Sequence, residues 1–105
     1  MSIERKTVVD QIEIRPDGVI QVRFAKQIVD GDTVVSQQWH RTSFVPGCDV
    51  NVQLAVVNEN LLTLGEEAVT EGVDAIKAHA SVAWTPAVIA AYEKSVEKQR
   101  AAQQV

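Results

Sequence analysis

The side chains best suited to covalent chemistry lie where a strand-like half of the sequence meets a helix-like half. Cys48, the single cysteine, is preceded by His40 and followed directly by Asp49. A cysteine nucleophile needs a base within hydrogen-bond reach and a third group that orients the base. A helix N-terminus would lower the thiol pKa, but the strand end would have to fold back to bring His40 to Cys48. We therefore expect no catalytic residue and no enzyme, with Cys48 a small residue at a tight turn.

Metal and phosphate ligands are sparse. His40 and His79 are the only histidines, and the sequence has neither a CxxC nor an HxxxH pair, whereas zinc needs several converging ligands. Asp30 and Asp32 flank a glycine but lack the remainder of a calcium-binding loop, so they indicate a turn. The five glycines are scattered singly, which excludes a glycine-rich phosphate loop. We expect no metal, no cofactor and no small-molecule substrate.

Composition limits the classes of partner. With 105 residues, 46% of them hydrophobic, the chain has the length of one globular domain spanning 1–105. Its net charge of −4, without a basic stripe, disfavours nucleic acid and anionic membranes. The acidity either maintains solubility or suits a basic partner. The sequence MSIERKTVV lacks the apolar core of a secretory signal, and no apolar run is long enough to span a bilayer.

The first part of the chain predicts an antiparallel β-meander over residues 7–45. Apolar residues recur in steps of two, which is typical of half-buried strands. The three strands are expected at 7–15, 19–29 and 33–45, joined by Pro-Asp-Gly and Asp-Gly-Asp turns. In the first strand Val8, Ile12 and Ile14 are expected on one face, which Asp10 interrupts. The free edge of this sheet could accept a fourth strand from another copy.

The part after Pro46-Gly47 predicts helices over residues 50–103. Apolar residues follow at steps of three and four from Val50 to Leu64, with Asp49 as N-cap. A second helix is expected from Glu71 to Ala83, with Thr70 as a possible cap, and a third from Pro86 to about Gln103 after the cap Thr85. Two to three helices packed on the meander give an α+β fold.

The third helix has an apolar stripe that becomes polar towards its end. Ile89, Tyr92 and Val96 form the stripe, and Gln99 and Gln103 continue it. The last turns therefore gain little from packing on this domain's core. They are either frayed or in contact with a partner, so Tyr92, Gln99 and Gln103 are candidate interface residues.

The residue types that dominate protein interfaces lie on the third expected strand. Trp39 and Arg41 share one face of this strand, and Phe44 lies near its end. Either these residues form a protein interface, or Trp39 lies under a helix while Arg41 pairs with an acidic neighbour. Trp84, just before the third helix, is expected to pack against Val88 or Ile89.

Several short motifs resemble small proteins encoded in tailed-bacteriophage genomes. The resemblance covers roughly residues 10 to 95. The matching motifs are the hairpin Ile12–Arg23, Asp30-Gly31, His40-Arg41-Thr42, Pro46–Val50, Val57-Asn58 and Thr85–Val88.

The resemblance implies a non-enzymatic phage structural protein, a minor tail or baseplate-region virion component that acts through protein–protein contacts. It implies a location in the virion tail after assembly and in the host cytoplasm when made. Its partners would be other tail proteins or further copies of itself. The alternative is a non-virion phage protein, such as a tail assembly factor or a host-defence inhibitor that binds a host protein.

Overall fold

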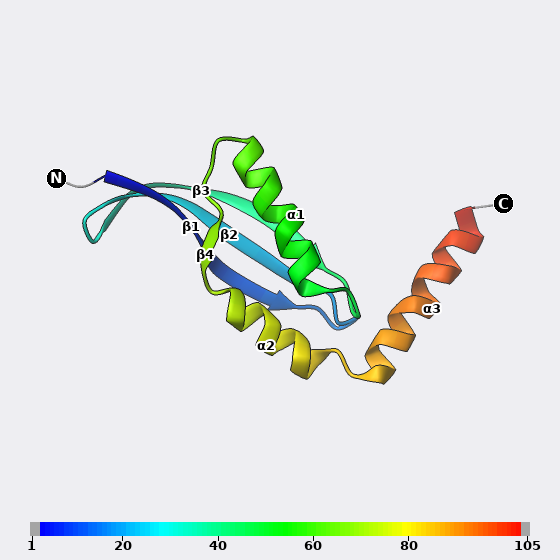
Figure 1. The fold of residues 1–105 in the computed structure, drawn as a ribbon. Helices are drawn as coiled ribbons and strands as arrows, with labels where there is room; N and C mark the ends of the chain where they lie inside the picture. The colour runs from blue at the N-terminus through cyan, green and yellow to red at the C-terminus, as the bar shows by residue number, and fades with distance from the viewer. Residues whose placement is uncertain (1–2, 104–105) are drawn as a thin grey trace.

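The computed structural model describes residues 3–103 and has an α+β fold. Three long strands form an antiparallel meander, a short fourth strand extends it in the order β3-β2-β1-β4, and helices follow (Figure 1). The predicted meander and C-terminal helices are confirmed. The elements are β1 (Ile3–Ile14), β2 (Ile20–Asp30), β3 (Thr33–Phe44), α1 (Val50–Thr63), β4 (Val69–Glu71), α2 (Val73–Ala83) and α3 (Pro86–Gln103).

A bulge in β1 explains the acidic residue that interrupts its apolar face. The pairing of β1 with β2 shifts between Val9 and Gln11, so Asp10 has no direct partner in the register. A bulge inserts one residue and changes which side chains share a face. Val9 and Ile12 consequently pack against the core, whereas Val8 falls on the opposite face. The expectation that Val8 shares the core face of Ile12 is therefore wrong.

The fourth strand comes from this chain rather than from another copy. β4 pairs parallel to β1, with Thr7 opposite Val69. The Thr7 hydroxyl donates to the Glu67 carbonyl at 2.7 Å, and the Asn58 side chain accepts from the Val69 N–H at 2.9 Å. These bonds hold the connection between α1 and α2 at the sheet edge. Three residues are too few for the alternation that reveals a strand in sequence.

The second helix begins later than expected because β4 occupies its predicted first turn. α2 starts at Val73, and Gly72 is its N-cap residue with φ of 92°. The expected cap, Thr70, instead donates its hydroxyl to the Thr7 carbonyl at 3.4 Å. A Cβ at position 72 would overlap the Val9 side chain. Glycine is therefore required both by the left-handed conformation and by the close approach to β1.

The core lies between the sheet and the first two helices. Asp49 caps α1 by accepting from the N–H groups of Asn51 at 2.9 Å and Val52 at 3.3 Å. Burying each large apolar side chain contributes about 1.5–3 kcal/mol. The buried cluster comprises Ile20, Val22 and Phe24 of β2, Phe44 of β3, Leu54, Val57 and Leu61 of α1, and Ile76 and Ala80 of α2.

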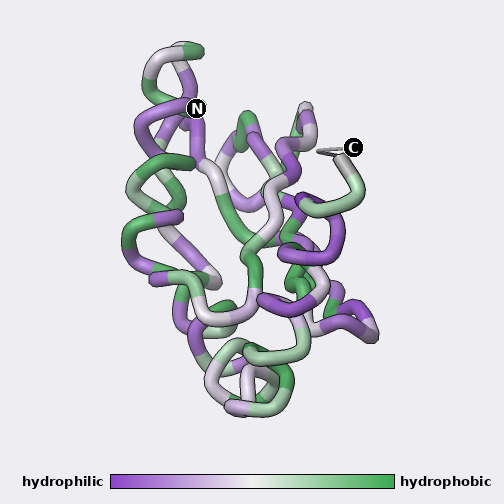
Figure 2. The backbone as a smooth tube through the Cα atoms, turned by 90° about the vertical axis from the view of Figure 1, so that its right-hand side faces the viewer, coloured by the Kyte–Doolittle hydropathy of each residue, from purple (hydrophilic) through white to green (hydrophobic). Residues whose placement is uncertain are grey.

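The third helix leaves the body of the molecule (Figure 1). Its first turn approaches two sheet-end turns, with Val88 beside Gly18 and Ile89 beside Gly47. Trp84 anchors this corner by donating its indole N–H to the Gly18 carbonyl at 2.7 Å. The radius of gyration is 16.5 Å, against about 13 Å for a compact chain of this length. The segment before the C-terminus is hydrophilic to weakly hydrophobic (Figure 2).

Candidate functional site: an uncovered sheet face

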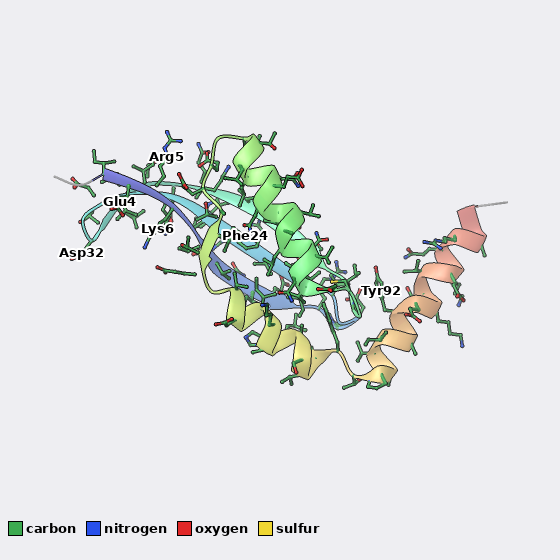
Figure 3. The ribbon with its side chains drawn as sticks, in the orientation of Figure 1. Glu4, Arg5, Lys6, Phe24, Asp32 and Tyr92 are labelled. Atoms are coloured by element: carbon green, nitrogen blue, oxygen red, sulfur yellow. The ribbon has the colours of Figure 1, made fainter. Side chains whose placement is uncertain are left out.

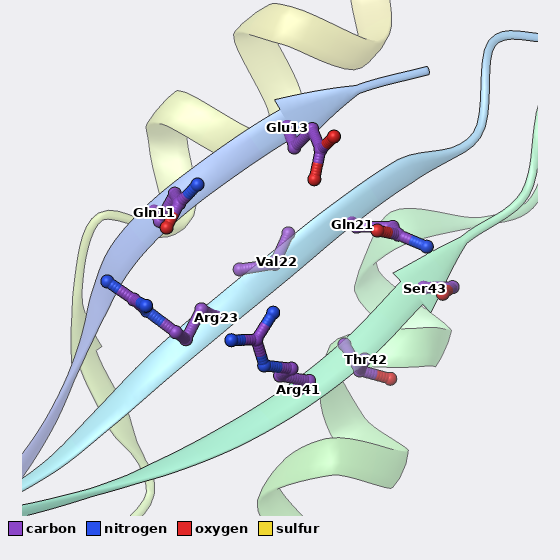
Figure 4. Close-up of a pocket in the computed structure, with 8 residues that line it drawn as sticks. All are labelled: Gln11, Glu13, Gln21, Val22, Arg23, Arg41, Thr42 and Ser43. Carbon is purple, nitrogen blue, oxygen red and sulfur yellow. The ribbon is translucent and has the colours of Figure 1, made fainter.

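The sheet has one face under helices and one face without them. Figure 4 views the uncovered face, with α1 and α2 behind the strands. Side chains from β1, β2 and β3 surround a shallow hollow of about 150 Å³ on this face. The polar side chains that line it on this face are the exposed Gln11, Glu13, Arg41 and Ser43 and the half-buried Gln21 and Arg23.

A row of three interacting side chains crosses this face from β1 to β3. The Arg23 Nη2 atom lies 2.5 Å from Asp10 Oδ2, and its Nε donates to the same oxygen at 2.7 Å. The Arg23 guanidinium carbon lies 4.2 Å from the centroid of the Trp39 ring. The ion pair and the cation–π contact each fix an orientation of the guanidinium group. Arg23 therefore holds Trp39 flat on the sheet, with 44% of the Trp39 surface still exposed.

Arg41 is the second cation of this face. It lies directly opposite Arg23 in the β2–β3 register. Both residues line the hollow, and Arg41 extends from β3 towards β2 while Arg23 extends towards β1 (Figure 4). Like charges directly opposite on a sheet repel each other, and Asp10 offsets the charge of Arg23. Among residues 3–103, Arg41 takes part in neither of the ion pairs that form. Its guanidinium donors are therefore available to a partner.

The structure decides between the two alternatives for Trp39 and Arg41, an exposed interface or a buried tryptophan with a paired arginine. Trp39 does not lie under a helix, and Arg41 does not pair with an acidic neighbour in the described part of the chain. Both residues lie on the uncovered face. Phe44, in contrast, is completely buried in the core opposite Ile20. Its proposed role as an interface residue is corrected, because alternation turns its side chain towards α1.

The candidate residues of the third helix form a separate group. Figure 3 places Tyr92 on α3, while Phe24 lies beneath α1. Tyr92 is half-buried and Gln99 is exposed. Gln103 ends α3, and its side chain lies outside the described residues. The six candidates thus divide into a core residue, a pair on the sheet and a set on the projecting helix.

The residues considered for catalysis are not activated. Burial raises the pKa of the Cys48 thiol, which a hydrogen bond from the backbone at Val45 partly offsets and the charge of Asp49 reinforces. Burial and nearby Lys26 lower the pKa of His40. The thiol is thus protonated and the imidazole neutral near pH 7. Within residues 3–103 there is no hydrogen bond between these side chains, and no cluster of three or more potential metal ligands.

Comparison with protein families, with curated proteins and with solved structures found no match. Across the described elements, no helix combines the length and apolarity required to cross a membrane. The assignment of function therefore rests on the site and on the sequence motifs.

Sequence reasoning missed two members of the site. Asp10 is noticed only as an interruption in an apolar face, and Arg23 only as part of a polar one. An acidic residue that breaks strand alternation is itself a signal for a bulge. A basic residue on the next strand, close to the position opposite the break, could then be recognised as its ion-pair partner.

Proposed function

We propose that this protein is a non-enzymatic interaction protein that receives a protein partner on its uncovered sheet face. The observation that carries the proposal is the exposed Trp39 ring, which Arg23 holds in place. On the same face lies Arg41, which forms no ion pair among residues 3–103. Tryptophan and arginine are enriched among the residues that contribute most to interface energy. The partner packs on the indole and accepts hydrogen bonds from Arg41.

Preorganisation supports this role for Trp39. A side chain that is already fixed loses less conformational entropy on binding than a mobile one. The contact with Arg23, itself fixed by Asp10, holds the indole ring before a partner arrives. Removing such an anchor typically costs about 2 kcal/mol or more of binding energy.

The charge of this face favours a protein over a polyanion. Arg23 of β2 and Arg41 of β3 are accompanied on this face by Asp10 and Glu13 of β1, so the formal charges of these four residues balance. Binding to nucleic acid depends on an excess of cations that neutralises phosphates. A balanced face with one tryptophan is suited to a mixed polar and apolar protein surface.

The resemblance of several sequence motifs to those of tailed-phage proteins supports a role in a tailed-phage particle. We infer that the protein is a minor tail or baseplate-region component, made in the host cytoplasm and carried in the virion. The elongated shape and the projecting α3 helix suit a subunit that contacts neighbours at more than one place. Those neighbours are other tail proteins or further copies of this chain.

Mass spectrometry of purified particles tests the virion assignment. The chain should be present in particles of the phage that encodes it, with a copy number set by the symmetry of the tail. Absence from purified particles would overturn the virion assignment. In that case an assembly factor or a host-defence inhibitor, using the same sheet face, would be the function to examine.

A further inference from the structure

The two edges of the sheet differ in how far they are protected. The outer strand at one edge is β4, which has three residues and leads directly into α2. At the other edge lies β3, a twelve-residue strand whose second side pairs with no strand among residues 3–103. An unpaired strand presents a row of backbone donors and acceptors that can pair with another strand.

β3 has few of the features that usually protect an edge strand. Prolines, lysines, inward-pointing charges and bulges are the common protections. β3 contains neither proline nor lysine, and Arg41 is its single formally charged residue. One bulge, at Val35, lies near the start of the strand, and the register with β2 is continuous from Ser36 to Phe44. Residues 33–39 are all exposed. Figure 3 shows the sheet end near Glu4 and Asp32 extending beyond α1, so that helix does not cover it.

We propose that a second copy of this chain pairs its own β3 antiparallel to β3, giving a two-fold dimer with one continuous eight-stranded sheet. This inference does not depend on the virion assignment. Two identical strands related by a two-fold axis can pair only in the antiparallel sense, and the interface is then closed. Because β4 is short and followed by α2, the far edges do not offer an equivalent strand, so assembly stops at two copies.

Charge and overlap place the two-fold axis between Gln38 and His40. An axis at Arg41 would set this cation against the partner's Arg41, which is unfavourable. An axis between Gln38 and His40 avoids that repulsion and pairs most of β3. Every axis in this range brings Arg41 opposite an uncharged residue of the second copy. If the axis passes through His40, that residue is the partner's Trp39. Because β3 contains no acidic residue, it could not form ion pairs with a basic strand of another protein. Two copies of β3 can pair without placing like charges opposite each other.

The two copies of α1 lie on the same side of this continuous sheet. Asn58 faces β4 through its bond to Val69. Val56 is two positions away and so lies on the opposite flank of the helix, towards β3. Val56 is 44% exposed. In the dimer this flank faces its counterpart across the two-fold axis.

The size of the contact indicates a dimer of moderate affinity. A strand of twelve residues is about 40 Å long and a sheet about 10 Å thick, so the edge alone buries on the order of 400 Å² per copy. A standard stable interface buries about 800 Å² per partner. Trp39 and the α1 flank must supply part of the difference. We therefore expect dissociation in the micromolar range, which corresponds to about 8 kcal/mol.

Sedimentation equilibrium with matched variants tests the dimer. The wild-type chain should pass from monomer to dimer with rising concentration, without larger species. Gln37→Lys adds a charge to the edge near the two-fold axis and should weaken association at least tenfold. Gln99→Lys adds the same charge on exposed α3 and should leave association unchanged. A wild-type monomer at about 500 μM, far above a micromolar dissociation constant, would overturn the proposal, as would full association of Gln37→Lys.

Disulfide cross-linking then tests the arrangement of the strands. In a Cys48→Ser background, single cysteines are introduced at positions 36 to 42 in turn, with Gln99→Cys as control. Only a residue near the two-fold axis approaches its own counterpart within the roughly 5.5 Å Cα separation that a disulfide needs. Cross-linking should peak between Gln38 and His40 and fall on both sides. A dimer without such a peak would show that another surface mediates association and would refute the β3 pairing.

Discussion

Arg23 and Trp39, on neighbouring strands, are joined by a cation–π contact of 4.2 Å on the uncovered face of the sheet. The contact is supported from the other side by the ion pair of Arg23 with Asp10. The bulge at Asp10 in β1 thereby determines the position of an aromatic ring on β3. The three residues are remote in sequence and act as one unit.

The Arg23 contact should restrict the motion of the Trp39 ring. In Arg23→Ala we expect a free energy of unfolding lower by about 1 kcal/mol, because a partly exposed ion pair and a cation–π contact are lost. The Trp39 signal should sharpen and move towards the random-coil position in fluorine NMR of 5-fluorotryptophan protein, while the Trp84 signal stays. Lys6→Ala, which removes the exposed 3.8 Å pair with Glu71, is the control. An unmoved Trp39 signal would contradict the preorganisation of this ring.

Alanine substitutions at Phe44 and at Trp39 should lower the free energy of unfolding by clearly different amounts. Phe44→Ala empties a fully buried site and should lower the free energy of unfolding by about 3–5 kcal/mol. Trp39→Ala removes a half-exposed ring and should cost about 1 kcal/mol. Urea denaturation followed by circular dichroism measures both. Equal losses would mean that Trp39 is a core residue and not a docking residue.

Gly72 should be the glycine least tolerant of substitution. Alanine at this position would adopt the left-handed conformation and overlap Val9, so Gly72→Ala should cost about 2–4 kcal/mol. Gly31 also has a positive φ, but nothing lies within 4 Å of a Cβ there. Gly31→Ala should therefore cost about 1–2 kcal/mol. Thermal melts of both variants decide the point, and a larger loss at Gly31 would contradict the packing of β4 and α2 on β1.

His40 should make the protein less stable in mild acid. Burial and Lys26 lower the pKa of His40 in the folded state, so below the unfolded pKa the unfolded chain binds more protons. Its contribution to stability is present above the unfolded pKa and is lost as pH falls through the folded pKa. Between pH 7.5 and pH 5, the wild-type chain should lose more stability than His40→Gln in urea titrations. An identical loss in both proteins would exclude His40 as the cause.

The sequence predicted the parts of the fold that depend on local periodicity. The apolar steps from Val50 to Leu64 and the Thr85-Pro86 start correctly indicate α1 and α3 because capping and amphipathicity are local. β4 could not be found, since three residues carry no period. Only the part of the site that depends on local periodicity was predicted. Alternation placed Trp39 and Arg41 on one face, but the role of Asp10 depends on a bulge that only pairing with β2 reveals.

Incorporation of Trp39→Ala into phage particles tests the central claim most directly. Val82→Ala, which changes an exposed residue on α2 at the helical side of the molecule, is the matched control. Copy number by quantitative mass spectrometry should be unchanged for Val82→Ala and at least tenfold lower for Trp39→Ala, as expected for a loss of about 2 kcal/mol of binding energy. Equal copy numbers of a folded Trp39→Ala variant and the wild-type chain would contradict docking through the uncovered sheet face.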